Sequence, residues 1–139
     1  MAAYIKFQPF VENLAEKVFN LQSDTLKYVL TNSAPLVTYN QLSQITQIAN
    51  GNGYVTGGAT VTVSSSSQSS GTYKLVLADV TWTASGGSIG PFQWVVLYDD
   101  TATNDELIGH WDYGSAITVP NGSSFTADAD PTTGILTNA

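Results

Sequence analysis

The chain has 139 residues, 42% of them hydrophobic, which is enough to build the core of one ordinary domain. It contains no cysteine, which excludes disulfide bonds, thiolate metal sites and a cysteine nucleophile. Four lysines and no arginine accompany eleven carboxylates, and the net charge of -7 argues against nucleic acid and anionic membranes as partners.

No window approaches the roughly 20 apolar residues of a membrane-spanning helix, and the first residues do not resemble a secretion signal. We therefore expect synthesis and use without export by that route. Only 11% of the residues are charged, against a usual quarter. Such a surface suits contact with other proteins, but a threonine-rich β-domain is also low in charge, and both explanations stay open.

The N-terminal third predicts an arm and two helices. Residues 1–8 form an apolar arm, and helical spacing of apolar side chains from Pro9 to Leu21 predicts an amphipathic helix over 9–21. Packing on the chain's own sheet is the favoured role of this helix, with partner binding as the alternative. A second, short helix is predicted over 40–49, where Leu42, Ile45 and Ile48 share a face.

Alternation predicts strands in most of the remaining chain. Leu26, Tyr28 and Leu30 mark a half-buried strand over 24–31. The serine-rich run 64–71 predicts a loop, either flexible or seated against a neighbour.

The stretch from Gly71 to Asp100 contains two apolar runs around one glycine-rich turn. In both runs apolar side chains point to both faces, so either both faces are covered or a bulge near Ala78 and Asp79 switches sides.

Further short strands are expected from Leu107 to the C-terminus, with turns at Asn121-Gly122 and Asp130-Pro131. About eight short strands with regular turns predict a mainly β fold, an antiparallel, jelly-roll-like β-sandwich with two short helices in the N-terminal third. The chain 1–139 is expected to form a single domain, with the sandwich over 24–139.

The residues offer little chemistry, so no catalytic, cofactor or metal site is predicted. The single histidine, His110, has no nucleophile elbow to serve and is expected to face solvent or to bond locally. The acidic loop 99–106 lacks the spacing of a calcium loop and is expected to be a turn without metal. The three tryptophans are expected to be core or interface anchors, with a lectin-like surface as the alternative.

Several segments together resemble small virion proteins of tailed bacteriophages, over nearly the whole chain. The segments are residues 18–32, 48–54, 82–92, 97–100, 107–114 and 134–136. The shared motifs concern shape, not catalysis. The resemblance implies a head-associated capsid decoration or cementing protein with a jelly-roll-like fold.

On this resemblance the protein is a non-enzymatic structural component, synthesised in the host cytoplasm and located on the capsid exterior. Its partners would be the major capsid protein or other virion proteins, and it would form a homo-oligomer, a dimer or a trimer. Tyr4, Ile5 and Phe7 of the arm are the candidate subunit or capsid interface, because a free apolar terminus would otherwise fray.

The alternative is a receptor- or glycan-binding module of a tail or fibre. A glycan-binding surface predicts exposed, clustered tryptophans, whereas a decoration protein predicts buried ones. A glycan-cleaving enzyme is the weakest option, because Asp112 is predicted to face away from its neighbours Trp111 and Tyr113.

Overall fold

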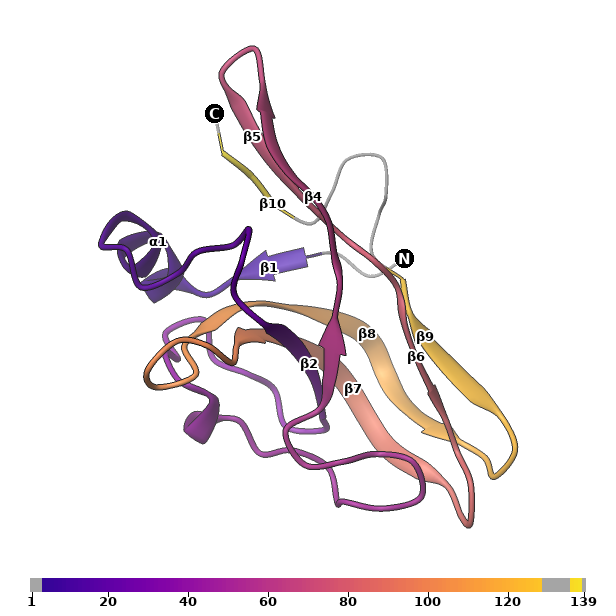
Figure 1. Cartoon of the computed structure of the whole chain (residues 1–139). Helices are drawn as coiled ribbons and strands as arrows, with labels where there is room; N and C mark the ends of the chain where they lie inside the picture. Colours follow the sequence, from indigo (N-terminus) through magenta and orange to yellow (C-terminus); the bar gives the residue numbers. More distant parts are fainter. Residues whose placement is uncertain (1–3, 129–135, 139) are drawn as a thin grey trace.

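The computed structural model describes residues 4–128 and 136–138, and these form a mainly β, antiparallel structure (Figure 1). The first elements are β1 (Tyr4–Lys6), α1 (Gln8–Ala15), β2 (Leu26–Thr31), the 3-10 turn η1 (Leu42–Gln44) and β3 (Ala59–Val61). The remaining strands are β4 (Val63–Ser69), β5 (Thr72–Leu77), β6 (Val80–Thr83), β7 (Ile89–Asp99), β8 (Leu107–Val119), β9 (Ser124–Ala127) and β10 (Leu136–Asn138). The predicted turn at Asp130-Pro131 lies outside the described residues.

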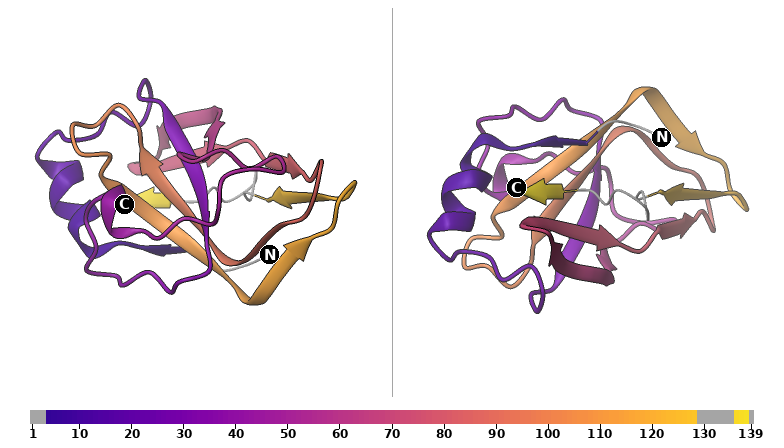
Figure 2. Two further views of the ribbon diagram at one scale, coloured as in Figure 1. Left: turned by 90° about the horizontal axis from the view of Figure 1, so that it is seen from below. Right: turned by 90° about the horizontal axis from the view of Figure 1, so that it is seen from above.

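The strands form three sheets that surround one core. A five-stranded sheet has the order β1-β8-β7-β2-β3, a three-stranded sheet the order β10-β5-β4, and β6 pairs with β9. The main core takes Leu30 and Leu97 from the first sheet, Leu75 from the second and Trp82 from the third. The views from above and below show the long strands β7 and β8 crossing the middle of the molecule (Figure 2).

The second face of the large sheet is covered as well, which explains why β7 is apolar on both sides. Val29 and Val96 point away from the main core into a smaller apolar cluster with Ile45 and Phe7. The cover is the connection between β2 and β3, residues 32–58, which runs beneath the sheet in Figure 1. Gly57 fixes it there, since its carbonyl accepts the Tyr98 hydroxyl proton at 2.7 Å.

Helix α1 begins where the sequence predicts but ends six residues earlier than expected, at Ala15 instead of Leu21. Lys17 adopts a left-handed conformation with φ 68°. The Val18 N–H then donates to the Asn13 carbonyl and the Lys17 N–H donates to Leu14, which is the Schellman pattern that ends a helix. Glycine usually occupies this position, so with a lysine there the sequence gives no signal that the helix ends.

The second predicted helix, over 40–49, is wrong, because the segment forms only the 3-10 turn η1. Only one turn of the segment bonds within itself, and other backbone groups bond to β2 and to the loop between β7 and β8. The Leu42 N–H donates to the Asp105 carbonyl at 3.0 Å, and the Ile48 N–H donates to the Leu30 carbonyl at 3.0 Å. These bonds turn Ile45 into the smaller cluster, where its burial outweighs the local helical preference.

The serine-rich run is also a correction, since residues 63–69 form strand β4 and not a loop. It pairs with β5 through a tight turn at Ser70 and Gly71, and this hairpin rises from the body at the top of Figure 1. The irregularity expected near Ala78 and Asp79 is real, because β5 ends at Leu77 and β6 starts at Val80 in a different sheet.

Candidate functional site

The predicted arm is part of the fold. Tyr4, Ile5 and Lys6 pair with β8, where Tyr4 lies opposite Trp111 and Ile5 opposite His110. The Tyr4 ring lies 5.3 Å from the Trp111 ring, and Phe7 is completely buried in the smaller cluster. Of the three candidate interface residues, only Ile5, 40% exposed, is accessible enough to contact a partner with a large part of its side chain.

His110 is buried, so the solvent-facing position, one of the two expected from sequence, is wrong. It is 4% exposed, and its ring lies 5.0 Å from that of Phe7. Its Nδ1 has no hydrogen-bond partner among the described residues. Burial lowers the pKa of this histidine from its usual range. A neutral imidazole therefore serves as an apolar packing group beneath the arm.

The three tryptophans do not form a common surface. Trp82 and Trp111 are 4% and 5% exposed and belong to the main core, while Trp94 is half-buried. Trp82 stacks near Phe125 at 6.2 Å and Trp111 meets the edge of Tyr28 at 5.5 Å. The arrangement matches the anchoring role expected of them, and it lacks the clustered exposed rings that a lectin-like surface needs.

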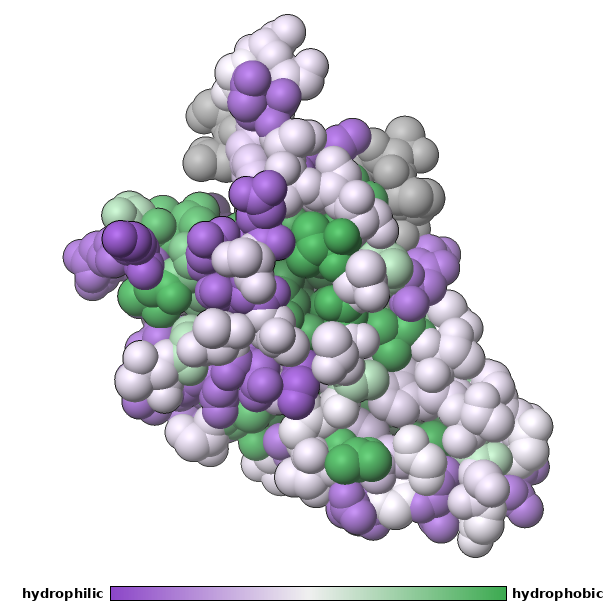
Figure 3. All heavy atoms as spheres, viewed as in Figure 1, coloured by the Kyte–Doolittle hydropathy of each residue, from purple (hydrophilic) through white to green (hydrophobic). Residues whose placement is uncertain are grey.

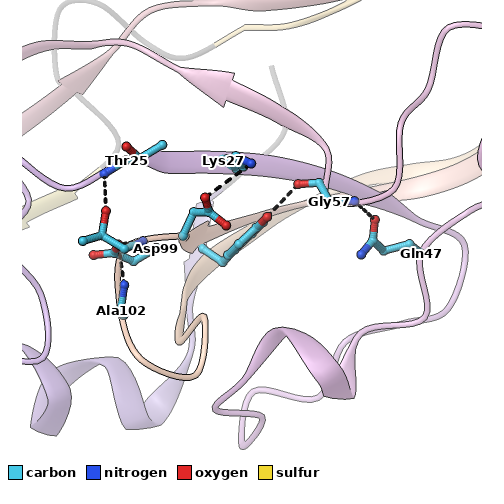
Figure 4. Close-up of polar contacts among 9 residues, drawn as sticks. Thr25, Lys27, Gln47, Gly57, Asp99 and Ala102 are labelled. Atoms are coloured by element: carbon cyan, nitrogen blue, oxygen red, sulfur yellow. Dashed lines mark hydrogen bonds and ion pairs between the residues drawn. The ribbon is translucent and has the colours of Figure 1, made fainter.

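The acidic loop between β7 and β8 uses its carboxylates to hold its own backbone (Figure 4). Asp99 Oδ1 accepts the N–H groups of Thr101 and Ala102 at 2.9 and 3.2 Å. Glu106 Oε1 accepts the Asn104 N–H at 2.6 Å. The described part of the chain contains no group of three or more histidines and carboxylates arranged to hold a metal ion.

Asp99 also forms a carboxyl pair with Asp24 that the sequence reading missed. Asp99 is fully buried, and its Oδ2 has no hydrogen-bond partner within normal distance. Burial, followed by the nearby Asp24 carboxyl, raises the pKa of Asp99 to about 7.

The alternation of side chains along β2 and β7 already indicated that Asp24 and Asp99 lie on the same face of the sheet. Leu97 and Asp99 share one face of β7, and Asp99 lies opposite Leu26 of β2. Asp24, two residues before Leu26, therefore falls on the same side. What was missing was the register between two strands about 70 residues apart in sequence, which only the folded sheet provides.

An open groove of about 980 Å³ lies beside this pair. It runs between residues 17–24, the β7–β8 loop and the β4–β5 hairpin. Leu14, Val18 and Leu21 give it an apolar part. The polar lining includes amide side chains of Asn20, Gln68 and Asn104 and the charged side chains of Lys17, Asp24 and Glu106. The groove itself was not predicted from sequence, because its walls come from three distant segments, although the acidic loop 99–106 that lines it was considered as a calcium site and rejected.

Among the described residues that line the groove, no histidine is present. A nucleophile, an activating base and an orienting group have to lie within hydrogen-bond reach of one another. The buried His110 and the hydrogen bonds of Asp99 and Glu106 serve the fold instead. The uncharged amides and hydroxyls are suited to contacts with polar, neutral groups.

Comparisons with known proteins give no assignment. No family model, no curated protein and no solved structure matches the chain. Among the described residues, no helix is long and apolar enough to cross a membrane.

Proposed function

We propose that the protein is a non-enzymatic structural component of a tailed-phage virion that binds the outside of the capsid lattice and stabilises the head. The observation that carries the proposal is the β4–β5 hairpin, which projects from the body and is uncharged from Thr62 to Tyr73. In Figure 3 much of its surface is white to pale purple, with a few strongly hydrophilic residues among these pale ones. A projecting neutral surface can be buried against another protein without desolvating charges.

Two further features support the proposal. Trp82 and Trp111 are buried, as a decoration protein predicts and a glycan-binding surface does not. All three sheets contribute to one core, which supports an antiparallel, jelly-roll-like sandwich as the finer description of the fold. The major capsid protein or another virion protein is the proposed partner, and the capsid exterior the proposed location.

The direct test is co-sedimentation of the purified protein with capsids of the same phage. We expect saturable binding and a higher temperature of capsid disruption. Ile5→Asp should weaken the binding, because it charges the accessible residue of the arm, whereas Val55→Asp changes another exposed apolar residue and serves as the matched control. A protein that stays in the supernatant, or a particle map without it on the head exterior, contradicts the proposal.

A glycan-binding tail or fibre module is the second candidate, and the groove is the observation in its favour. Amide and hydroxyl groups beside the ring of Tyr73 are the chemistry that binds sugars. Titration with bacterial surface oligosaccharides, followed by NMR shifts of groove residues, tests it. Shifts that Tyr73→Ala abolishes would favour this function over decoration, and an unchanged spectrum would remove it.

A further inference from the structure

Strand β4 is the longest of the outermost strands in the described sheets. It contains seven residues, whereas the edges formed by β1, β3, β10, β6 and β9 contain three or four. No described strand lies on its outer side. Proteins usually protect such edges with lysine, proline or a bulge. Here the register shift lies between Val63 and Ser65, so the edge from Ser65 to Ser69 is regular and unprotected.

The pairing with β5 shows which backbone groups of β4 point outward. Ser70 and Gly71 both have positive φ, 52° and 84°, as in a two-residue type I′ hairpin. The flanking pair, Ser69 and Thr72, therefore exchanges hydrogen bonds, and so does Ser67 with Lys74 two residues along. Ser66 and Gln68 alternate with these, so their N–H and C=O groups point away from β5.

The chain's charge makes a second copy the fitting occupant of this edge. Two molecules that each carry a net charge of -7 repel one another wherever their acidic surfaces meet. Strand β4 itself carries no charge, and Lys74 on β5 is the one charged residue of the β4–β5 hairpin, so copies can approach along β4 with little of this cost. The groove beside Ser66 and Gln68 leaves space next to the edge for an added strand.

We propose that β4 pairs in antiparallel orientation with β4 of a second copy, about a two-fold axis at Ser67. In this register Ser66 of each molecule exchanges both backbone hydrogen bonds with Gln68 of the other. A register centred on Ser66 would need Ser64, which lies at the bulge and is out of line. The two three-stranded sheets join into one continuous sheet across the axis.

This dimer deepens the proposed structural function, because it names the surface of self-association. The side chains at the edge are small and polar and bury little apolar area, so we expect a weak dimer with a dissociation constant of roughly micromolar. The experiments below use the purified full chain without capsids. Their failure would remove the dimer and leave capsid binding to its own test.

The absence of cysteine from the chain permits a sharp crosslinking test. Ser67 faces its own copy across the axis as a non-hydrogen-bonded pair, whose Cβ atoms lie about 4.5 to 5.5 Å apart, close to the separation in a disulfide. Ser67→Cys should form a covalent dimer under mild oxidation. Ser123→Cys, an exposed serine in the turn before β9, is the matched control and should stay largely monomeric.

A backbone test complements the crosslink. Ser66→Pro removes an outward N–H and leaves the bonds to β5, so it should shift the dimer to monomer in analytical ultracentrifugation. Ser66→Ala is the matched control. Like the proline variant it loses the hydrogen bond between the Ser66 and Tyr73 hydroxyls, at 2.8 Å, but it keeps the backbone N–H and should dimerise like the original chain. Ser67→Lys opposes two like charges across the axis and gives a second disrupting variant should proline impair folding.

The proposal is overturned by a chain that stays monomeric well above micromolar concentration, or by equal crosslinking at positions 67 and 123. A dimer that Ser66→Pro and Ser67→Lys both leave intact, with the hairpin folded, overturns it too. In each case the edge is free for a strand from a different protein.

Discussion

The buried carboxyl of Asp99 allows a quantitative prediction about the effect of pH on stability. The substitution Asp99→Asn keeps a side-chain oxygen that can accept the N–H groups of Thr101 and Ala102, and it removes the ionisable proton. Its amide can also donate to Asp24, as a protonated Asp99 would. The change therefore removes the charge while preserving the geometry of the loop.

The magnitude follows from the difference in pKa between the folded and unfolded chains. The pKa of Asp99 rises from 3.8 to about 7 on folding. Each unit corresponds to about 1.4 kcal/mol, so the ceiling is about 4 kcal/mol, and we expect about 2 to 4 kcal/mol because Asp24 shares the proton. Because the pKa of Asp99 is higher in the folded chain, its protonated carboxyl favours the folded state. This contribution to the free energy of unfolding is fully present below pH 3.8 and is lost as the pH rises through about 7.

The assay is urea unfolding of the original chain and Asp99→Asn at several pH values between 4 and 8. The two should be nearly equally stable at pH 4, and the variant should gain its full advantage by pH 8. Asp100→Asn is the control. Asp100 is on the same loop, and its ion pair with Lys27 at 3.4 Å is partly exposed (Figure 4), so its loss should cost less than about 1 kcal/mol.

The reasoning about burial would be refuted by a stability difference that does not change with pH. It would also be refuted by a variant that is less stable than the original chain at pH 8. Either result would mean that Asp99 is ionised in the folded protein without penalty.

Three further outcomes concern the arm and the covered face of the large sheet. Phe7→Ala should cost about 3 to 5 kcal/mol in denaturant unfolding, because it empties a fully buried site, whereas Ile5→Ala should cost less than about 1 kcal/mol. Deleting residues 2–8 should lower the melting temperature strongly, because it removes β1 and the fully buried Phe7. An unchanged melting temperature would show that β1 contributes little. Gly58→Ala should lower the free energy of unfolding by about 1 to 3 kcal/mol or more, since Gly58 has φ +81° and an added Cβ would overlap the Tyr28 carbonyl. A neutral effect in thermal unfolding would mean that the connection 32–58 can shift off the sheet.

Strand pairs with strong alternation were predictable because their side-chain pattern alone decides which face is buried. The apolar runs of β5 and β7 are strands as predicted. β2 is also a strand, as the alternation of Leu26, Tyr28 and Leu30 predicts, but it is not half-buried, because Val29 on its other face is also fully buried. The expected interruption near Ala78 and Asp79 is the point where the chain changes sheets. In all these cases hydrophobic burial and local preference agree.

The candidate site was much less accessible from sequence. The arm was recognised as apolar, but Phe7 is buried within its own chain and only Ile5 is largely exposed. The serine-rich run was predicted to be a loop because it is low in complexity and has no apolar side chains to pack, yet the tight turn and pairing with β5 make it a strand and a sheet edge. A weak local preference cannot reveal an edge that a distant strand creates.

The sequence by itself determined the mainly antiparallel β character of the chain and its apolar core strands. It also determined the low share of charged residues and the negative net charge. Only the tertiary structure decided that 40–49 lies flat against the sheet, that Asp99 meets Asp24, and that β4 becomes an open edge. The physical reason is the same in each case. Side-chain periodicity is a local property, whereas the partners of backbone groups and buried carboxyls come from residues distant in sequence.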